Sequence, residues 1–298
     1  MRAVQPKRAL VIGGVNMDIG GSPMNKLIMR DSNPGIITVR PGGVGRNIAH
    51  DMRLLGLDVS LIAAVGDDVY GHGILKSCAE LGLDMSLARV MPDMRSSTYL
   101  YVTDETGDME LAISDMEIVR CITPDYVARH IAAINGFDAV VLDANLPQET
   151  IEYAAAHCTA PIYADPVSTA KAARLLPVLD KLAAIKPNIY EAERLTGEID
   201  PECAAKRLVE SGVKRVFISL GEEGMLAADE NELVRLPREY VTVVNTTGAG
   251  DAATAAIVWA GLKGLSLYDS TRAAVKAGAI TATCEGANNP ELSADKLI

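Results

Sequence analysis

The chain has 298 residues, of which 49% are hydrophobic and 22% are charged, and this length and composition suit one large α/β domain. Its net charge of −11 argues against binding to nucleic acid or to an anionic membrane, because both need basic surfaces. The cysteines, 5 in number, lack the close spacing of a zinc or redox site. The first apolar run, residues 9–12, is too short for a signal peptide or a membrane span, so we expect a cytoplasmic protein.

Short apolar runs alternate with helical segments along the chain. The runs predicted as buried strands are residues 9–12, 59–65, 139–142, 161–164 and 216–220. The predicted helices are residues 45–55, 70–81, 124–134, 149–157, 202–210 and 250–262. Such alternation indicates a mainly parallel sheet with helices on both faces, in which ligands bind at the carboxyl ends of the strands.

Two segments break this rhythm. Residues 22–40 and 96–115 alternate apolar and polar side chains, and a turn is predicted at residues 104–108. That period is typical of half-buried antiparallel strands. We expect segments at about residues 15–40 and 95–116 to form a small β-sheet lid on a single domain, residues 1–298, although edge strands of the main sheet would give the same pattern.

Polar and glycine residues follow the first strand and open the first helix. Asn16 and Asp18 lie after the strand, where a carboxylate can accept hydrogen bonds from neighbouring sugar hydroxyls, or can belong to an ordinary turn. Gly42 and Gly43 allow close approach of a ligand, and Asn47 offers a donor and an acceptor. Because no Walker A loop is present, a neutral polyol fits this segment better than a triphosphate; a glycine-rich helix start without a ligand is the alternative.

Asn188 and Glu191 are three residues apart at the start of another predicted helix. An amide and a carboxylate on one face suit hydrated Mg²⁺, which prefers a few oxygen ligands. The same spacing is that of a capping box, in which the two side chains only stabilise the helix start. A second glycine-bearing turn, residues 219–224, follows a strand at the same edge of the sheet.

The segment 245–251, Asn-Thr-Thr-Gly-Ala-Gly-Asp, precedes a helix of small residues. Backbone N–H groups at such a helix start make an anion-binding nest, strengthened by the helix dipole. Asp251 lies inside this nest, and removal of a proton from an attacking hydroxyl group explains a carboxylate beside bound phosphate. A dinucleotide-binding loop and a tight helix start with a capping Asp remain alternatives.

These motifs, in this order and spacing, resemble those of the ribokinase family. The resemblance covers essentially the whole chain. It implies a Rossmann-like, three-layer, mainly parallel sheet with a β-sheet lid, and phosphoryl transfer from ATP, with Mg²⁺, to a sugar hydroxymethyl group. By the same resemblance, Asp251 is the base and the N–H groups of Gly248, Ala249 and Gly250 form the anion hole.

The resemblance also implies binding roles for other residues. Those expected to hold the sugar are Asn16, Asp18, Gly42, Gly43 and Asn47. Those expected to bind the nucleotide are Asn188, Ser219, Gly221, Gly224, Thr247, Ala277 and Thr283, and those expected near Mg²⁺ are Asn188 and Glu191.

Within the family, the chain most resembles the members whose acceptor is pseudouridine. The segments that carry this likeness are residues 31–35, 41–49, 113–116, 165–168 with Lys171, and 284–290. Uracil linked through carbon offers two N–H donors and two carbonyls, and Ser32, Asn33, Asp115 and Lys171 are expected to match them. Phosphorylation of ribose or of another nucleoside, and nucleoside binding without turnover, are the alternatives.

Asn245 differs from the wider family, in which many members have an Asp that helps to bind an activating monovalent cation. The loss of that charge argues against activation by K⁺. A projecting sheet with an apolar face also favours a homodimer formed through the lid.

Overall fold

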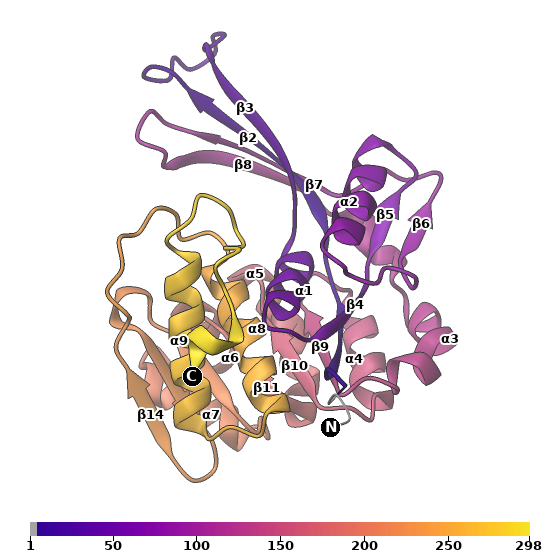
Figure 1. Cartoon of the computed structure of the whole chain (residues 1–298), viewed down its shortest axis with the longest axis vertical. Helices are drawn as coiled ribbons and strands as arrows, with labels where there is room; N and C mark the ends of the chain where they lie inside the picture. Colours follow the sequence, from indigo (N-terminus) through magenta and orange to yellow (C-terminus); the bar gives the residue numbers. More distant parts are fainter. Residues whose placement is uncertain (1–4) are drawn as a thin grey trace.

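The computed structural model describes residues 5–298 and contains a large central sheet (Figure 1). Its strand order is β14-β13-β12-β11-β10-β9-β1-β4, with β4 to β12 parallel and β13 and β14 antiparallel. The strands are β1 (Arg8–Ile12), β4 (Asp58–Ile62), β9 (Ala139–Asp143), β10 (Ile162–Asp165), β11 (Leu182–Ile185), β12 (Val216–Ser219), β13 (Met225–Ala228) and β14 (Leu233–Leu236). The chain order reverses at β1, so the carboxyl ends of β1 and β9 lie at the switch point of the sheet, where α/β proteins usually bind ligands.

The predicted strands all lie in this sheet except for the second half of one. The predicted run 59–65 ends at Ile62, and β5 (Ala64–Gly66) pairs instead with β6 (Arg89–Met91) in a separate two-stranded sheet. Strands β6, β11, β13 and β14 were not predicted, and the last three are four residues long. β11 and β13 each contain two alanines, which favour strands only weakly, and Arg235 interrupts the apolar pattern of β14.

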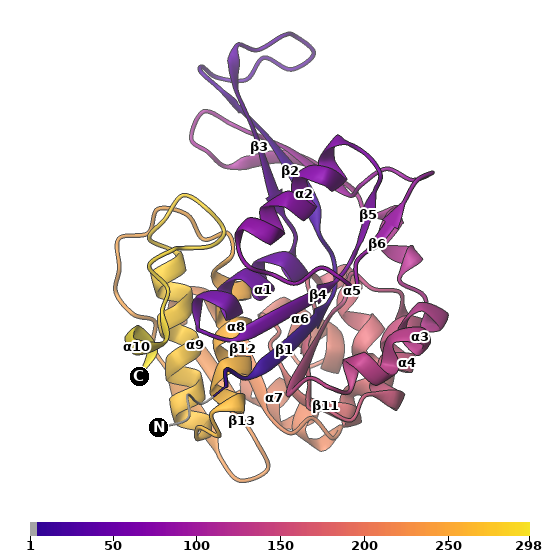
Figure 2. The ribbon, with the colours of Figure 1, turned by 45° about the vertical axis from the view of Figure 1, so that its right-hand side comes forward.

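Helices cover both faces of the sheet, which makes three layers (Figure 2). The first core cluster includes side chains of α1 (Val44–Leu54), α2 (Val69–Glu80), α8 (Ala249–Leu262), α9 (Leu267–Thr281) and α10 (Ala294–Leu297). The second includes side chains of α3 (Pro124–Ile134), α4 (Gln148–His157), α5 (Thr169–Ala172), α6 (Ile189–Thr196) and α7 (Pro201–Glu210). The 3₁₀ helices are η1 (Glu117–Cys121), η2 (Ala173–Lys181) and η3 (Gly221–Glu223).

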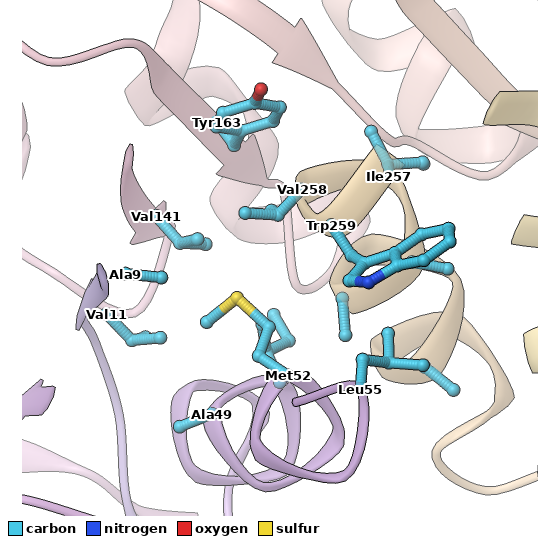
Figure 3. Close-up of a cluster of buried hydrophobic side chains, with 14 of the residues drawn as sticks. Ala9, Val11, Ala49, Met52, Leu55, Val141, Tyr163, Ile257, Val258 and Trp259 are labelled. Atoms are coloured by element: carbon cyan, nitrogen blue, oxygen red, sulfur yellow. The ribbon is translucent and has the colours of Figure 1, made fainter. Parts of the chain in front are cut away.

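The packing of α1 against α8 fixes the two helix starts that matter for the site. Met52 of α1 and Leu55, the residue that follows this helix, face Val258 and Trp259 of α8, and strand residues such as Val11 close the cluster from the sheet (Figure 3). These side chains are almost fully buried. The two helices are therefore held rigidly with respect to each other by apolar contacts.

Local sequence sets the helix boundaries. Asp68, Thr123, Asp200 and Ser266 each cap a helix by accepting a backbone N–H three residues ahead, and all predicted helices are confirmed within two residues. Among residues 5–298, no helix is long and apolar enough to cross a membrane.

The two alternating segments form their own sheet, with the order β3-β2-β7-β8. Its strands are β2 (Asn16–Pro23), β3 (Gly35–Gly42), β7 (Thr98–Thr103) and β8 (Met109–Asp115). The sheet projects from the main body, with the β2–β3 turn at its far end (Figures 1 and 2). This four-stranded sheet, called the lid below, excludes the edge-strand alternative; its β2–β7 pair is parallel and the other two pairs are antiparallel.

Candidate active site

The polar residues of the site follow the carboxyl ends of adjacent parallel strands. Asn16 comes after β1, Asp143 ends β9, Asp165 ends β10 and Lys186 follows β11. Because parallel strands end at one edge of the sheet, residues far apart in the chain converge here. The starts of α1 and α8 reach the same place, which brings Asn47 next to Asp251.

Asp251 lies in the first turn of α8 and accepts a hydrogen bond from Asn47, with Nδ2 2.9 Å from Oδ2. Burial raises the pKa of this carboxyl to about 7, and the nearby charge of Asp165 adds to the effect. The Asn47 hydrogen bond and the charge of Lys186 oppose the rise. A carboxyl group with a pKa near neutrality is suited to exchange a proton with a hydroxyl group.

The start of α8 has the form of an anion-binding nest. Gly248 is the N-cap residue with φ 83°, a left-handed conformation, and a side chain there would collide with the Ala287 carbonyl. Within the part of the chain that the structure describes, no side chain caps this helix by a hydrogen bond. The Ala249 N–H contacts the Thr246 carbonyl at 3.2 Å, so the amides best placed for an anion are those of the glycine that follows and of Asp251.

A buried lysine lies beside this nest. Lys186 is only 6% exposed, and its Nζ is 3.6 Å from Oδ2 of Asp165. Its Nζ would also be 3.2 Å from a Cβ added at Gly250. Burial by itself lowers the pKa of this ammonium group, but the charges of Asp165, Glu191 and Asp251 outweigh burial and raise it. The nest thus contains a fixed positive charge that the sequence analysis did not identify.

Asp165 is held in place from two sides. Thr254, one turn into α8, donates from Oγ1 to Oδ2 of Asp165 at 2.7 Å. The ammonium group of Lys186 approaches the same oxygen. Asp165 therefore ties the end of β10 to both the lysine and the helix that carries Asp251.

The predicted sugar-binding residues also gather at this edge. Asn16 donates to Oδ1 of Asp18 at 2.5 Å, and burial raises the pKa of Asp18. A Cβ at Gly42 would collide with the Asp18 carboxyl group, and one at Gly43 would collide with the backbone of Gly14. The structure therefore brings the predicted pair Asn16 and Asp18 into contact with the predicted pair Gly42 and Gly43.

Asn47 has an unused acceptor in the same place. Its Oδ1 is buried and has no hydrogen-bond partner within residues 5–298. An orphaned buried oxygen costs free energy unless a ligand supplies a donor. The amide thus holds Asp251 with one atom, and its other atom is free to accept a hydrogen bond from a ligand.

Lys171 of α5 belongs to a second polar cluster beside the predicted sugar-binding residues. Its Nζ donates to Oδ1 of Asn145 at 2.6 Å, and burial lowers its pKa. Asp143 accepts backbone N–H bonds from Gly14 and Asn145, and burial raises its pKa to about 6. Asn145 and Asp143 were not predicted; their position directly after a buried strand was the available signal.

Asn188 and Glu191 form the capping box that was one of the two alternatives. Each side chain accepts the backbone N–H of the other residue, at 2.9 and 2.8 Å. Asn188 also lies next to Ser219 through an isolated parallel bridge, so the two predicted nucleotide-binding turns are adjacent. A role of the pair with Mg²⁺ stays a prediction.

The other predicted nucleotide-binding residues occupy different environments. Gly221 and Gly224 flank the turn of η3 with φ of 60° and 95°. Thr247 is exposed, as is Thr283, whose Oγ1 donates to the Ile280 carbonyl. Ala277 is fully buried in the core, so its side chain presents no surface to a ligand in this structure.

The residues predicted to bind the base do not come together at the site. Ser32 and Asn33 lie in the β2–β3 turn, where Asn33 binds the Ile28 backbone of its own loop. Asp115 pairs in register with Thr98 and receives a 3.3 Å contact from Arg95. Alternation along β8 places Asp115 on the lid face opposite to Asp18. Of the four residues predicted to bind the base, only Lys171 lies beside the predicted sugar-binding residues.

A network behind the site links the two helix starts. Asn288 donates from Nδ2 to the Asn47 carbonyl and to Oδ1 of Asp51, at 3.0 and 2.9 Å. The residue before it, Ala287, packs its carbonyl against Gly248. Asn245 donates to the Glu285 carbonyl of the same loop at 2.9 Å. The loop that contains Glu285 and Asn288 therefore connects α1 with the start of α8.

A model of the pfkB family of carbohydrate kinases matches residues 7–294. The chain is 34% identical to the pseudouridine kinase of Escherichia coli (strain K12) over 296 residues, covering 97% of this chain and 95% of that protein. The structure of a carbohydrate kinase from Agrobacterium tumefaciens is 28% identical with a TM-score of 0.87, over 98% of this chain and 95% of that one. That of Arabidopsis thaliana ribokinase complexed with ribose and ATP has a TM-score of 0.84 at 20% identity, over 98% and 99% of the two chains, and shares the fold. The chain therefore belongs to the pfkB family of carbohydrate kinases and is a phosphotransferase acting on a hydroxyl group of a sugar or nucleoside.

Proposed function

We propose that the protein transfers the γ-phosphoryl group of ATP to the 5′-hydroxyl group of pseudouridine. The observation that most supports phosphoryl transfer is the Asn47–Asp251 contact. It fixes a carboxyl group with a pKa of about 7 between the proposed sugar-binding residues and the nest. The choice of pseudouridine is supported by the 34% identity over nearly the full length to a pseudouridine kinase.

In the proposed reaction, Asp251 accepts the proton of the 5′-hydroxyl group as its oxygen bonds to the γ-phosphorus. The bond between phosphorus and the bridging oxygen breaks, and ADP leaves with that oxygen. The amides at the start of α8 and the ammonium group of Lys186 face the transferred oxygens and stabilise their negative charge. Asp18 and Asn47 hold the sugar so that its hydroxyl group meets the carboxyl group of Asp251.

The nucleotide is proposed to lie along the turns after β11 and β12, near Asn188, Ser219, Gly221 and Gly224. Mg²⁺ bound to ATP would neutralise phosphate charge. The capping box uses Oε2 of Glu191, so Oε1 is the oxygen of that residue outside it, and an oxygen donor of this kind suits Mg²⁺ through water. Thr247 and Thr283 are proposed to border the same pocket.

Base recognition is proposed to begin at Lys171 and Asn145, which present a donor and an amide beside the sugar-binding cluster. Ser32, Asn33 and Asp115 would take part only after movement of the lid or through a second copy of the chain. The apolar face of the lid, which exposes Ile37 and Ile113, is proposed to bind the same face of a second copy. A cytoplasmic location stays a prediction.

We further propose that K⁺ does not activate the enzyme. Both polar atoms of the Asn245 side chain are used: Oδ1 accepts the Thr247 N–H at 3.0 Å and Nδ2 donates to the Glu285 carbonyl. The amide therefore joins two loops without a charge that would attract a cation. This bond supports the proposal because it needs no bound ion.

The test is an ATP-consumption assay with Mg²⁺ that compares pseudouridine, uridine, ribose and adenosine. We expect kcat/KM for pseudouridine to exceed that for each other acceptor by at least tenfold. Activity on ribose or uridine instead would overturn the substrate but keep the mechanism. Lack of turnover on all acceptors would favour nucleoside binding without turnover. The wild type would then be as inactive as Asp251→Asn, the control variant that lacks the proposed base.

A further inference from the structure

The two faces of the lid differ in chemistry. Strand register aligns Asp18, Tyr99 and Ser114 across β2, β7 and β8. Tyr101 lies two residues along β7 and therefore shares this face. Alternation puts apolar side chains such as Leu100 on the opposite face. The lid thus presents two tyrosines on the side that bears the proposed sugar-binding carboxylate.

The two rings form one continuous surface. Their centroids are 6.0 Å apart with an interplanar angle of 35°. Tyr101 lies across Gly20, since a Cβ there would be 2.5 Å from its Oη, and the Tyr99 hydroxyl group reaches Sδ of Met109 at 3.3 Å. Both tyrosines remain partly exposed. Their rings therefore lie along the sheet rather than being enclosed in a core.

The position of this surface suits the group attached to the sugar. Residues directly opposite on paired strands have Cβ atoms about 5 Å apart, so Tyr99 is the cross-strand neighbour of Asp18. A sugar whose hydroxyl groups are held by Asp18 brings its anomeric substituent within reach of Tyr99. A free sugar carries only a hydroxyl group there and gains nothing from an aromatic surface, whereas a nucleobase stacks on one.

We propose that Tyr99 and Tyr101 form a stacking surface for the nucleobase, which makes a nucleoside the acceptor class. This inference rests on the proposed function. Lys171 and Asn145 can form hydrogen bonds with polar atoms at the edge of a base but do not contact its face. The two tyrosine rings provide the contact with the face. A purely structural reason, the covering of Gly20 by Tyr101, applies to Tyr101 and not to Tyr99.

The experiment compares Tyr99→Ala with Tyr99→Phe in kinetic assays with pseudouridine, and with ribose as a competing ligand. We expect Tyr99→Ala to raise KM for pseudouridine about 5- to 100-fold with little change in kcat, and to leave the inhibition constant of ribose unchanged. Tyr99→Phe, which keeps the ring, should restore KM. Tyr268→Ala, at an exposed tyrosine of α9, is the matched control.

Equal weakening of pseudouridine and ribose by Tyr99→Ala, or no effect on either, would overturn the stacking surface. Calorimetric binding of pseudouridine to Asp251→Asn, with and without Tyr99→Ala, separates this result from failure of the proposed function. If the wild-type enzyme turns over no nucleoside but binding still depends on Tyr99, the function fails and the stacking surface stands. If turnover occurs and binding ignores Tyr99, the reverse holds.

Discussion

Asn47 and Asp251, 204 residues apart in the chain, meet through a 2.9 Å hydrogen bond between the first turns of two helices. The contact joins the segment that opens after the glycine pair at 42–43 to the segment that forms the anion nest. It depends on the packing of α1 against α8, which apolar side chains maintain. The starts of α1 and α8, proposed to bind the acceptor and the phosphate, are therefore fixed to each other by the core.

The raised pKa of Asp251 predicts an activity that depends on pH. Only the deprotonated carboxylate can accept the proton, so with a pKa of about 7 we expect kcat to fall about tenfold per pH unit well below pH 7 and to level off above it. Asp251→Asn should lower kcat by about 10² to 10⁴ and change nucleoside and ATP binding by less than tenfold. Steady-state kinetics and calorimetry measure both, and near-native turnover of the variant would reject Asp251 as the base.

The same shift predicts a cost in stability. Because folding raises the pKa of Asp251, this carboxyl group contributes its full stability below its unfolded-state pKa, near 4. That contribution is lost as the pH rises through about 7. Asp251→Asn should thus be more stable than the wild type at pH 8, by up to about 4 kcal/mol, and by almost nothing at pH 4. Thermal unfolding at the two pH values measures the difference, and a gain that does not depend on pH would contradict it.

Removal of the Asn47 amide should move the pH profile. The hydrogen bond lowers the pKa of Asp251, so Asn47→Leu should shift the acid limb of kcat to higher pH. Loss of the free Oδ1 should also lower kcat/KM for the nucleoside by about 5- to 100-fold. Asn231→Ala, at an exposed amide of the β13–β14 turn, is the control, and an unshifted acid limb in Asn47→Leu would count against the contact.

Lys186 should act on both charge and fold. Lys186→Met removes the positive charge beside the nest, and we expect kcat to fall about 10²-fold or more and the pKa of Asp251 to rise further. It also leaves the Asp165 carboxylate unpaired, at a cost of about 3 to 5 kcal/mol in the free energy of unfolding. Lys186→Arg keeps the charge if the first variant does not fold. Wild-type kcat in a folded Lys186→Met would exclude the charge from the reaction.

The side-chain bonds of Asn245 predict how the enzyme responds to cations. We expect rates in K⁺ and Na⁺ to agree within about twofold, since the amide already joins Thr247 and Glu285. Asn245→Asp should lower the rate in Na⁺, because a carboxylate cannot donate to the Glu285 carbonyl, and K⁺ should then restore part of it. Strong activation of the wild type by K⁺ would contradict this prediction.

The apolar lid face predicts self-association. Ile37→Lys with Ile113→Lys should convert a dimer into a monomer, since these side chains are 75% and 63% exposed in the single chain. Sedimentation equilibrium measures the mass. A monomeric wild type would refute the proposed dimer. Ile298→Lys, at an exposed apolar residue outside the lid, serves as the control and should leave the mass unchanged.

Much of this protein follows from its sequence alone. Helix bounds depend on caps and on contacts within a few residues, so the segment that starts α8 could be identified with Asp251 in its first turn. The alternation of the two lid segments likewise predicted a separate sheet, because side chains of a strand face opposite sides in turn. Such patterns are local, and one chain displays them directly.

Only the tertiary structure decided which distant groups meet. Asp165 ends one short strand and Lys186 follows another. Nothing near them in the chain indicates that Lys186 lies beside Gly250 or that Asp165 contacts Thr254. Asp115 was expected at the base, yet the strand register puts it on the other lid face. Local sequence fixes where an element begins, but the register and order of strands depend on long-range pairing, and these place each side chain in the site.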